Sequence, residues 1–294
     1  MARPLRIEIP GAVYHVASKG DAGAAVFHDD ADRRALLAVI AQAMERFDAQ
    51  VLAYHLGHDG YELLLFTRQA NLSRLMRHLN GVYTQGYNRR HGGAGNLFQG
   101  RFKAVLVDRE AMLLEVCRHV DQSAVRTGLA KTPQGWPWSS YAAHAGAVAA
   151  PEWLEVQGLW SYLIGKPAQA VADRKRAAQR YERLLAEGAG PDIWQRLRHQ
   201  IFLGDEAFAA RMQQLAPAPA RRASAGSGRA AGLRSRPWRP WRDWLRESSS
   251  REEALYRAHT EGGLSMTGLA HELGLSVSRV SRLIAGHERS LHAH

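Results

Sequence analysis

A predicted β-hairpin at residues 51–66, VLAYHLGHDGYELLLF, constrains the fold of this chain more than any other stretch. Two short apolar runs flank the tetrapeptide Gly57-His58-Asp59-Gly60. Asp-Gly between apolar runs is a strong hairpin signal, because glycine tolerates the positive φ angles of tight turns. We therefore expect the segments before and after this hairpin to pack on it.

The segments around the hairpin alternate between strand and helix patterns. Strands are predicted at residues 12–18 and 103–108, and helices at residues 31–47, from residue 72 onward and around residues 113–120. The resulting order of strand, helix, strand, strand, helix, strand, helix is typical of a ferredoxin-like fold. We thus predict an α+β domain over residues 1–145, with a four-stranded antiparallel sheet and helices on one face.

Three further segments are predicted after this domain. Residues 146–215 are interpreted as an all-α extension, including the stretch IWQRLRHQIFLGDEAFAARMQQL. Residues 216–240 consist mainly of Ala, Pro, Gly, Ser and Arg, so they cannot bury a core and are predicted to be a basic flexible linker. Residues 241–294 are predicted to form a small helix-turn-helix domain, with a turn at Gly274 and core positions at Ala270 and Val280.

The charge of the chain favours a polyanionic partner. Thirty-nine Lys and Arg residues against 28 Asp and Glu residues give a formal net charge of +11. This excess points most simply to nucleic acid, although a GC-rich genome would also enrich arginine. The single cysteine, Cys117, excludes an internal disulfide and fits a reducing compartment. The sequence shows no signal-peptide or membrane-span pattern, so we expect a cytoplasmic, nucleoid-associated protein without a membrane partner.

Two groups of residues are predicted to contact nucleic acid. The first group surrounds a glycine-rich loop that also carries Phe98 and Phe102, and consists of Lys19, Arg89, Arg90, His91, Gln99, Arg101 and Lys103. The second group lies on the second helix of the helix-turn-helix and consists of Ser276, Ser278, Arg279, Ser281 and Arg282. A solvated basic turn and a helical hairpin for protein contacts are the respective alternatives.

The hairpin also carries side chains of the types that bind metals. They are His55, His58, Asp59 and Glu62. Side chains alternate between faces along a strand, so His58 and Glu62 are not expected to share a face with His55 unless the turn intervenes. No ligand-spacing rule is met, and we predict no metal site. His15 and His28 are interpreted as ordinary polar positions.

Several motifs in order resemble one protein family. They are MARPLRIEIPGAVYHVASKG, the hairpin, NLSRLMRHLNGVYTQGYNRRHG, GNLFQGRFKA and WPWSSY. Together they resemble the REP-associated tyrosine transposases, which are single-tyrosine HUH transposases with a ferredoxin-like fold. The resemblance covers residues 1–145 and continues more weakly through IFLGDEAF. It implies a DNA partner and a family chemistry in which two strand histidines hold a cation and a tyrosine attacks the phosphodiester.

The positions that carry this family chemistry are changed. The two strand histidines fall on Gly60 and Glu62, and the tyrosine falls on His119. The asparagine and proline that follow the tyrosine in the family fall on Ser123 and Ala124. Losing one component of a catalytic unit costs orders of magnitude in rate. The resemblance therefore implies a vestigial site at Gly60, Glu62 and His119, with no catalytic residue, metal ligand or cofactor.

We accordingly predict a catalytically inactive DNA-binding protein that recognises hairpin or repeat DNA and acts in regulation. Its first domain is expected to take a single-stranded hairpin, and its helix-turn-helix a duplex. The alternative is an active metal-dependent transposase or single-strand nickase with relocated residues, for which magnesium would be the cofactor. Tyr83 and Tyr87 are its candidate nucleophiles, although their helical spacing predicts core positions. A protein-interaction adaptor is a third class, and an RNA partner and the oligomeric state stay open.

Overall fold

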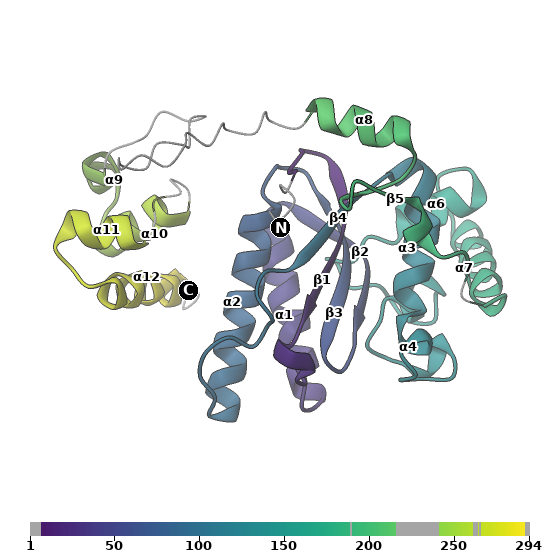
Figure 1. The fold of residues 1–294 in the computed structure, drawn as a ribbon, viewed down its shortest axis with the longest axis horizontal. Helices are drawn as coiled ribbons and strands as arrows, with labels where there is room; N and C mark the ends of the chain where they lie inside the picture. Colours follow the sequence, from purple (N-terminus) through teal and green to yellow (C-terminus); the bar gives the residue numbers. More distant parts are fainter. Residues whose placement is uncertain (1–6, 189, 216–240, 261–263, 265, 292–294) are drawn as a thin grey trace. The chain divides into compact units, whose positions relative to one another are not determined.

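The computed structural model describes residues 7–188, 190–215, 241–260, 264 and 266–291. The chain divides into two compact units, Met1–Pro219 and Ala220–His294 (Figure 1). The first unit contains both the predicted α+β domain and the predicted extension, so the extension belongs to the body of the first domain. The predicted linker, residues 216–240, lies outside the described residues. The domain boundaries proposed from the sequence stay predictions.

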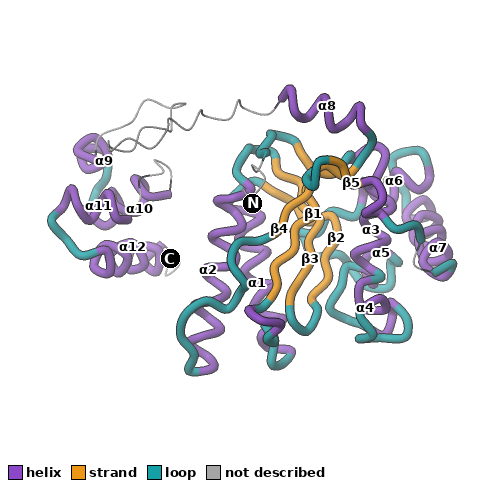
Figure 2. Tube along the Cα trace, viewed as in Figure 1, coloured by secondary structure: helices purple, strands orange, loops and turns teal. Residues whose placement is uncertain are grey.

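One sheet forms the centre of the first unit (Figure 2). Its four long strands are β1 (Ala12–Lys19), β2 (Ala49–Leu56), β3 (Gly60–Thr67) and β4 (Lys103–Val107). They lie in the order β2-β3-β1-β4 with antiparallel neighbours throughout, as predicted for a ferredoxin-like sheet. The predicted hairpin is confirmed as β2 and β3, and the Gly57 amide donates to the Gly60 carbonyl at 2.8 Å within its turn.

Helices cover both faces of this sheet, which corrects the prediction of helices on one face. The helices that pack on its four long strands are α1 (Asp30–Arg46), α2 (Leu72–His91) and α3 (Arg109–Asp121). α1 and α2 share a core with Tyr14 and Val16 of β1, whereas α3 shares a second core with Val13 on the other face (Figure 1). Because β1 is apolar at successive positions, both of its faces are buried.

The extension is not all-α, which corrects a second prediction. Its elements are α6 (Gln157–Ile164), α7 (Val171–Ala186), η3 (Ile193–Arg196), β5 (Leu197–Arg198), β6 (Phe202–Leu203) and α8 (Glu206–Leu215). The short helices that precede it are η1 (Asp21–Gly23), α4 (Ser123–Arg126), η2 (Pro133–Gly135) and α5 (Tyr141–His144). β6 pairs in parallel with β4, and β5 pairs antiparallel with β6. The sheet therefore has six strands, in the order β2-β3-β1-β4-β6-β5.

The two short strands lie in a stretch that the sequence analysis interpreted as helical. His199 and Gln200 adopt positive φ angles of 48° and 64°, which interrupts any helix at this point. Phe202 and Leu203 are fully buried, and the Asp108 amide donates to the Leu203 carbonyl at 2.9 Å. A short apolar run fits a strand or a helix equally well, and here the open edge of β4 selects the strand.

A buried polar network attaches the extension to α3 and β2. The Asp121 carboxylate accepts hydrogen bonds from Ser140 and, at 2.6 Å each, from His144 Nδ1 and the Tyr181 hydroxyl. His144 Nε2 lies 3.0 Å from the Leu52 carbonyl oxygen. Asp121 and His144 are fully buried, so the Asp121 carboxylate depends on these hydrogen-bond donors in place of water.

Replacing Asp121 with alanine should strongly destabilise the chain. It leaves His144, Ser140 and Tyr181 without their shared acceptor, and removing one partner of a buried pair costs about 3–5 kcal/mol. Urea unfolding at neutral pH measures this loss. Glu206→Ala is the matched control, since its carboxylate pairs with His199 on the surface and should cost at most about 1 kcal/mol. Equal losses in the two variants would contradict the role of the network.

The second unit is helical where it is described. Its helices are α9 (Trp241–Glu247), α10 (Arg251–Thr260), α11 (Met266–Leu273) and α12 (Val277–Leu291). Its core includes Trp241, Trp244, Leu255, Leu269, Ala270, Val280 and Ile284. Gly274 has a φ of 62° between α11 and α12, a conformation that favours glycine. The two helices around Gly274 are confirmed, while a DNA-binding helix-turn-helix stays a prediction.

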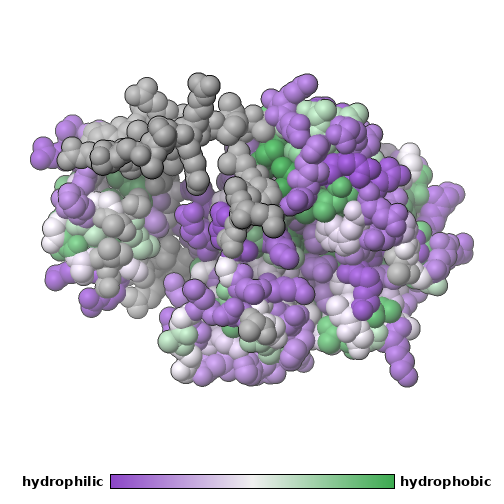
Figure 3. Space-filling view, viewed as in Figure 1, coloured by the Kyte–Doolittle hydropathy of each residue, from purple (hydrophilic) through white to green (hydrophobic). Residues whose placement is uncertain are grey.

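The described surface is mostly polar. Figure 3 shows hydrophilic side chains over most of the visible face, with apolar side chains in small patches. Exposed large apolar side chains, such as Tyr162 on α6 and Leu245 on α9, are scattered along the chain. None of the described helices combines the length and the apolar character needed to cross a lipid bilayer.

Candidate functional site

Polar residues form a row across the sheet on the face that α3 covers. In the strand register, Glu62 of β3 lies opposite His55 of β2 and opposite Ala17 of β1, and Ala17 lies opposite Lys103 of β4. Directly opposed residues of antiparallel strands share a face. His55 and Glu62 therefore do share a face, which corrects the expectation from strand alternation. The turn between the two strands resets the alternation.

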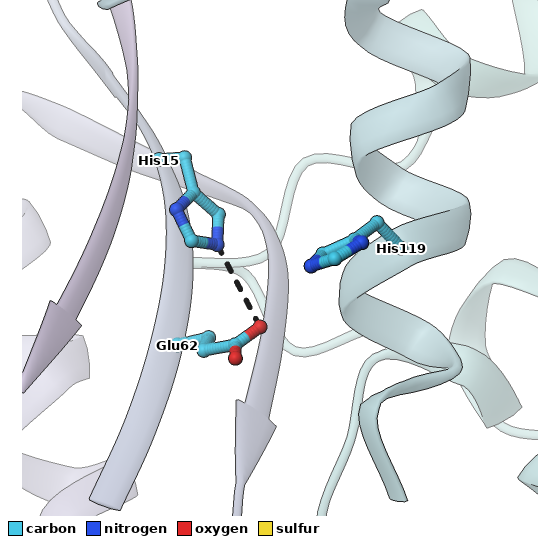
Figure 4. Close-up of side chains that lie close together, drawn as sticks. All are labelled: His15, Glu62 and His119. Atoms are coloured by element: carbon cyan, nitrogen blue, oxygen red, sulfur yellow. Dashed lines mark ion pairs between the residues drawn. The ribbon is translucent and has the colours of Figure 1, made fainter. Parts of the chain in front are cut away.

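Glu62 of this row and two histidines form a cluster of three potential metal ligands. They are His15 of β1, Glu62 of β3 and His119 of α3, and one ligand atom from each lies within 4.8 Å of the other two. Figure 4 shows both imidazoles and the carboxylate pointing into the same space between the sheet and α3. His15 Nε2 lies 3.6 Å from Glu62 Oε2. Among the described residues this cluster, rather than His55, His58 and Asp59, gathers ligand atoms.

The environment of Glu62 keeps its carboxylate ionised. Burial by itself would raise the pKa of Glu62, but His15, His119 and Arg126 outweigh burial and lower this pKa to about 2. Arg126 Nη2 lies 3.9 Å from Glu62 Oε2, and Ser123 Oγ donates to the same oxygen at 2.9 Å. Glu62 is thus an anion that accepts a hydrogen bond from Ser123 and lies beside the Arg126 guanidinium.

Burial and an aromatic neighbour define the environment of the two imidazoles. Burial, reinforced by Arg126, lowers the pKa of His119 to about 4, so its ring is neutral near pH 7. The indole of Trp194 in η3 packs edge-on against both rings, with centroid distances of 5.3 Å to His15 and 5.5 Å to His119. His15, predicted as an ordinary polar position, is instead 5% exposed, and its Nε2 has no hydrogen-bond partner among the described residues.

The neighbouring strand β1 leaves no space for a side chain at Gly60. A Cβ atom at this position would lie 2.5 Å from the Ser18 carbonyl oxygen and 3.1 Å from Lys19 Cα. Those contacts are with backbone, so a larger residue would require β1 and β3 to separate. A histidine is therefore incompatible with this strand spacing. Of the three positions predicted to be vestigial, only Glu62 and His119 come together.

The two candidate substitute nucleophiles lie on the other face of the sheet. Tyr83 and Tyr87 belong to α2, which packs against the face opposite α3. Tyr83 is 2% exposed and its hydroxyl donates to the Val26 carbonyl at 2.6 Å. The Tyr87 hydroxyl donates to the Ala25 carbonyl at 3.4 Å. Burial raises the pKa of Tyr83, so its hydroxyl is a poor source of phenolate. The prediction of core positions is confirmed for Tyr83.

Two members of the predicted basic group, Lys19 and Lys103, lie on the same sheet face as Glu62. Lys19 is opposite Gly60 and Lys103 is opposite Ala17, and both lysines are exposed. Gln99 and Arg101 are also exposed. The backbone N–H of Gln99 donates to the Lys19 carbonyl at 2.8 Å. In contrast to these exposed residues, Phe98 and Phe102 are only 7% and 8% exposed. Both pack in the core rather than beside the cations.

Arg90 and His91 of that group form ion pairs with carboxylates at the start of α1. Arg90 forms ion pairs with Asp29 and, at 2.8 Å, with Asp32, and His91 Nε2 lies 2.9 Å from Asp32. Asp29 also caps α1 by accepting from the Ala31 and Asp32 amides. The charge of Arg90 is thus partly neutralised by Asp29 and Asp32. Arg89, in contrast, is exposed. A nucleic-acid role for these residues stays a prediction.

The predicted residues of the second unit lie around the start of α12. Arg279, Ser281 and Arg282 are exposed, while Val280 and Ile284 of the same helix are buried. Ser276 precedes α12, and its Oγ accepts from the Arg279 amide at 3.3 Å, the contact of a helix N-cap. The side chain of Ser278 lies outside what the structure describes. Their predicted contact with DNA stays a prediction.

Four residues in or next to the cluster were not predicted as site residues from the sequence. They are His15, Ser123, Arg126 and Trp194. Ser123 counted only as a departure from the family pattern, and Arg126 and Trp194 carried no motif. The one available signal was the alternation in AVYHVAS, which puts His15 on the same face of β1 as Val13 and Ala17.

Comparisons with known proteins yield a distant structural neighbour. No protein-family model matches the sequence, and no curated protein sequence matches it. One solved structure with a similar chain is titled "Structure of the REP associates tyrosine transposase bound to a REP hairpin". That chain is 14% identical, and the similarity covers 53% of this chain and 93% of that chain with a TM-score of 0.44. A likeness at this level carries no argument on function, so neither residue roles nor partners are transferred from it.

The buried His55 predicts a pH dependence of stability. Burial lowers the pKa of His55 from 6.5 to about 4, and neither ring nitrogen has a hydrogen-bond partner among the described residues. The folded state therefore binds the proton less readily than the unfolded state. This contribution to stability is complete above pH 6.5 and is lost as the pH falls towards 4.

We expect His55→Leu to flatten this dependence. Between pH 7 and pH 5 the free energy of unfolding of the original chain should fall by about 1–2 kcal/mol more than that of the variant. Urea unfolding at the two pH values measures the difference. His58→Leu, at an exposed turn position, should keep the original pH dependence. Parallel pH profiles for His55→Leu and the original chain would refute the assignment.

Proposed function

We propose that this chain is a DNA-binding protein whose first unit contacts phosphates at the end of the sheet that carries Lys19 and Lys103. The observation that supports this most directly is the exposure of both lysines on the sheet face of Glu62, on adjacent strands. Two cations on neighbouring strands suit consecutive phosphates of one nucleic-acid strand. Exposed Arg101 and Gln99 add donors beside them.

The overall charge supports the same partner. A formal net charge of +11 attracts a polyanion over long range and raises the rate of encounter. Most of the basic residues are arginines, whose planar guanidinium group suits phosphate and base edges. We propose a location in the cytoplasm, in association with the chromosome.

The proposed division of labour assigns a single-stranded hairpin or repeat to the first unit and a duplex to the second. Arg279 and Arg282 are one turn apart on the exposed side of α12, the arrangement expected of a helix that enters a major groove. Two modest binding modules on one chain raise each other's effective concentration, so their joint affinity exceeds either alone. A regulatory role at such sites follows from binding without cutting.

We further propose that the chain does not cut DNA through a phosphotyrosine. In support, Gly60 leaves no room for a ligand side chain, and His119 occupies the position implied for the tyrosine. The hydroxyls of Tyr83 and Tyr87 are directed to carbonyl groups on the opposite side of the sheet. Loss of the nucleophile alone reduces such a reaction by orders of magnitude.

A second candidate function is metal-dependent cleavage of a single strand with relocated residues. The specific observation in its favour is the cluster of His15, Glu62 and His119, which could hold a cation near the basic sheet end. In that reaction a water would have to replace the tyrosine as the nucleophile, because His119 would serve as a ligand of the cation.

Replacing both Lys19 and Lys103 with alanine should weaken DNA binding and its salt dependence. If each lysine contacts one phosphate, the slope of log affinity against log salt should fall by about one to two in magnitude. Fluorescence anisotropy of a labelled hairpin with the full chain, across a salt series, measures both quantities.

Lys131→Ala with Lys175→Ala is the matched control, because it removes the same charge from exposed positions elsewhere on the first unit. This control should leave the slope within error of the original chain. Equal effects of the two double variants would show that net charge alone acts. Absence of salt-dependent binding to any hairpin, duplex or RNA would favour a protein-interaction adaptor instead.

The two candidate functions differ in a strand-cleavage assay. Incubating the full chain with an end-labelled hairpin oligonucleotide, with and without magnesium or manganese, should give a mobility shift but neither a cleaved product nor a covalent adduct. A metal-dependent product that disappears in Glu62→Gln but persists in His58→Gln would establish the second function. The exposed His58 lies in the same hairpin and controls for general loss of metal binding.

A further inference from the structure

Three elements that are distant in the sequence present His15, Glu62 and His119 to one another. β1 and β3 are hydrogen-bonded neighbours, which fixes the separation of His15 and Glu62, and α3 brings His119 from above the sheet (Figure 4). The donor atoms lie within 4.8 Å of each other, and His15 Nε2 is 3.6 Å from Glu62 Oε2. Ligand atoms around a tetrahedral zinc ion are about 3.3 Å apart, so small side-chain rotations would close the set.

Nε2 of His15 is a buried polar atom that faces the cluster. The side chain is 5% exposed and is held by the central strand of the sheet, yet its Nε2 is buried without a hydrogen-bond partner among the described residues. Burying a ring nitrogen without a partner is unfavourable. This nitrogen points to the space that Glu62 and His119 also face, where an ion would satisfy it (Figure 4).

We propose that His15, Glu62 and His119 bind one divalent transition-metal ion. Two imidazoles and one carboxylate suit zinc, manganese, iron, cobalt or nickel, whereas magnesium and calcium prefer oxygen ligands throughout. Three protein ligands leave a coordination position open. This donor set differs from two histidines on one strand, for which Gly60 offers no ligand and no space.

The residues around the cluster fit an ion site. Ser123 Oγ donates to Glu62 and fixes the orientation of its carboxylate, as outer partners of metal ligands do. Trp194 packs against both imidazoles and limits their movement. These contacts pre-organise all three ligands.

The positive charge of Arg126 opposes the binding of a cation. It lies 3.9 Å from Glu62, and a structural ion pair between the two is the competing explanation of the cluster. However, the Arg126 guanidinium already donates to the His119 carbonyl and, at 2.7 Å, to Ser123 Oγ. Arg126 thus has partners without Glu62, and its charge beside an open coordination position would favour an anionic ligand such as a phosphate oxygen.

Metal titration of the full chain tests this site without DNA. The protein, free of any histidine tag and stripped with a chelator, is titrated with Co²⁺ under visible absorption and with Zn²⁺ by calorimetry. We expect one ion per chain, a d–d spectrum of a low-coordinate N/O site, and displacement of Co²⁺ by an equivalent of Zn²⁺. Because DNA is absent, this result is independent of the proposed DNA binding.

Variants identify the ligands. Glu62→Gln and His119→Gln should each weaken binding at least about tenfold, and both side chains are partly exposed, so the variants should fold. His58→Gln, the matched control at an exposed turn position, should bind like the original chain. Zn²⁺ should also raise the unfolding temperature of the original chain and of His58→Gln, but not of the two ligand variants.

Either of two outcomes would overturn the proposal. One is the lack of stoichiometric Co²⁺ and Zn²⁺ uptake by the original chain. The other is uptake that Glu62→Gln and His119→Gln leave unchanged, which would assign the ion to other histidines. His15→Ala adds a third test where it folds, and the two partly exposed ligands decide the matter where it does not.

Discussion

The pairing of β1 with β3 and β4 is the constraint on which the candidate site depends. This register aligns Ala17 with Glu62 and with Lys103, and it directs His15 towards α3. A slip of one residue would exchange the two faces of β1 and send His15 into the core beneath α1 and α2. Tyr14 and Val16 fill that core, so apolar burial on one side of the sheet holds the polar residues on the other.

The extension completes the site that the sheet begins. β6 pairs with the free edge of β4, and η3, which precedes it, sets Trp194 against both imidazoles of the cluster. The hydrogen bond from the Tyr181 hydroxyl of α7 to the buried Asp121 carboxylate ties the same extension to α3, the helix that carries His119. Stability and site geometry therefore share elements, because loosening α3 or the extension would displace a ligand as well as expose a buried charge.

Local patterns explain which parts of the fold could be predicted. The hairpin, β1, β4, α1, α2 and α3 all follow from periodicity and turn residues close together in the chain. The strands β5 and β6 could not be predicted, since two-residue strands have no period and form only where β4 offers an edge. Likewise the covering of both sheet faces by helices depends on how α3 and the extension pack.

The sequence by itself determined an α+β domain, a second helical unit, the net charge of +11, and the residue types at Gly60, Glu62 and His119. These are matters of residue identity and local spacing. Only the tertiary structure decided that Glu62 and His119 meet the buried His15, because the three residues come from elements that sheet pairing and helix packing bring together. Cross-strand register and the position of α3 are properties of the whole fold, and no short-range pattern encodes them.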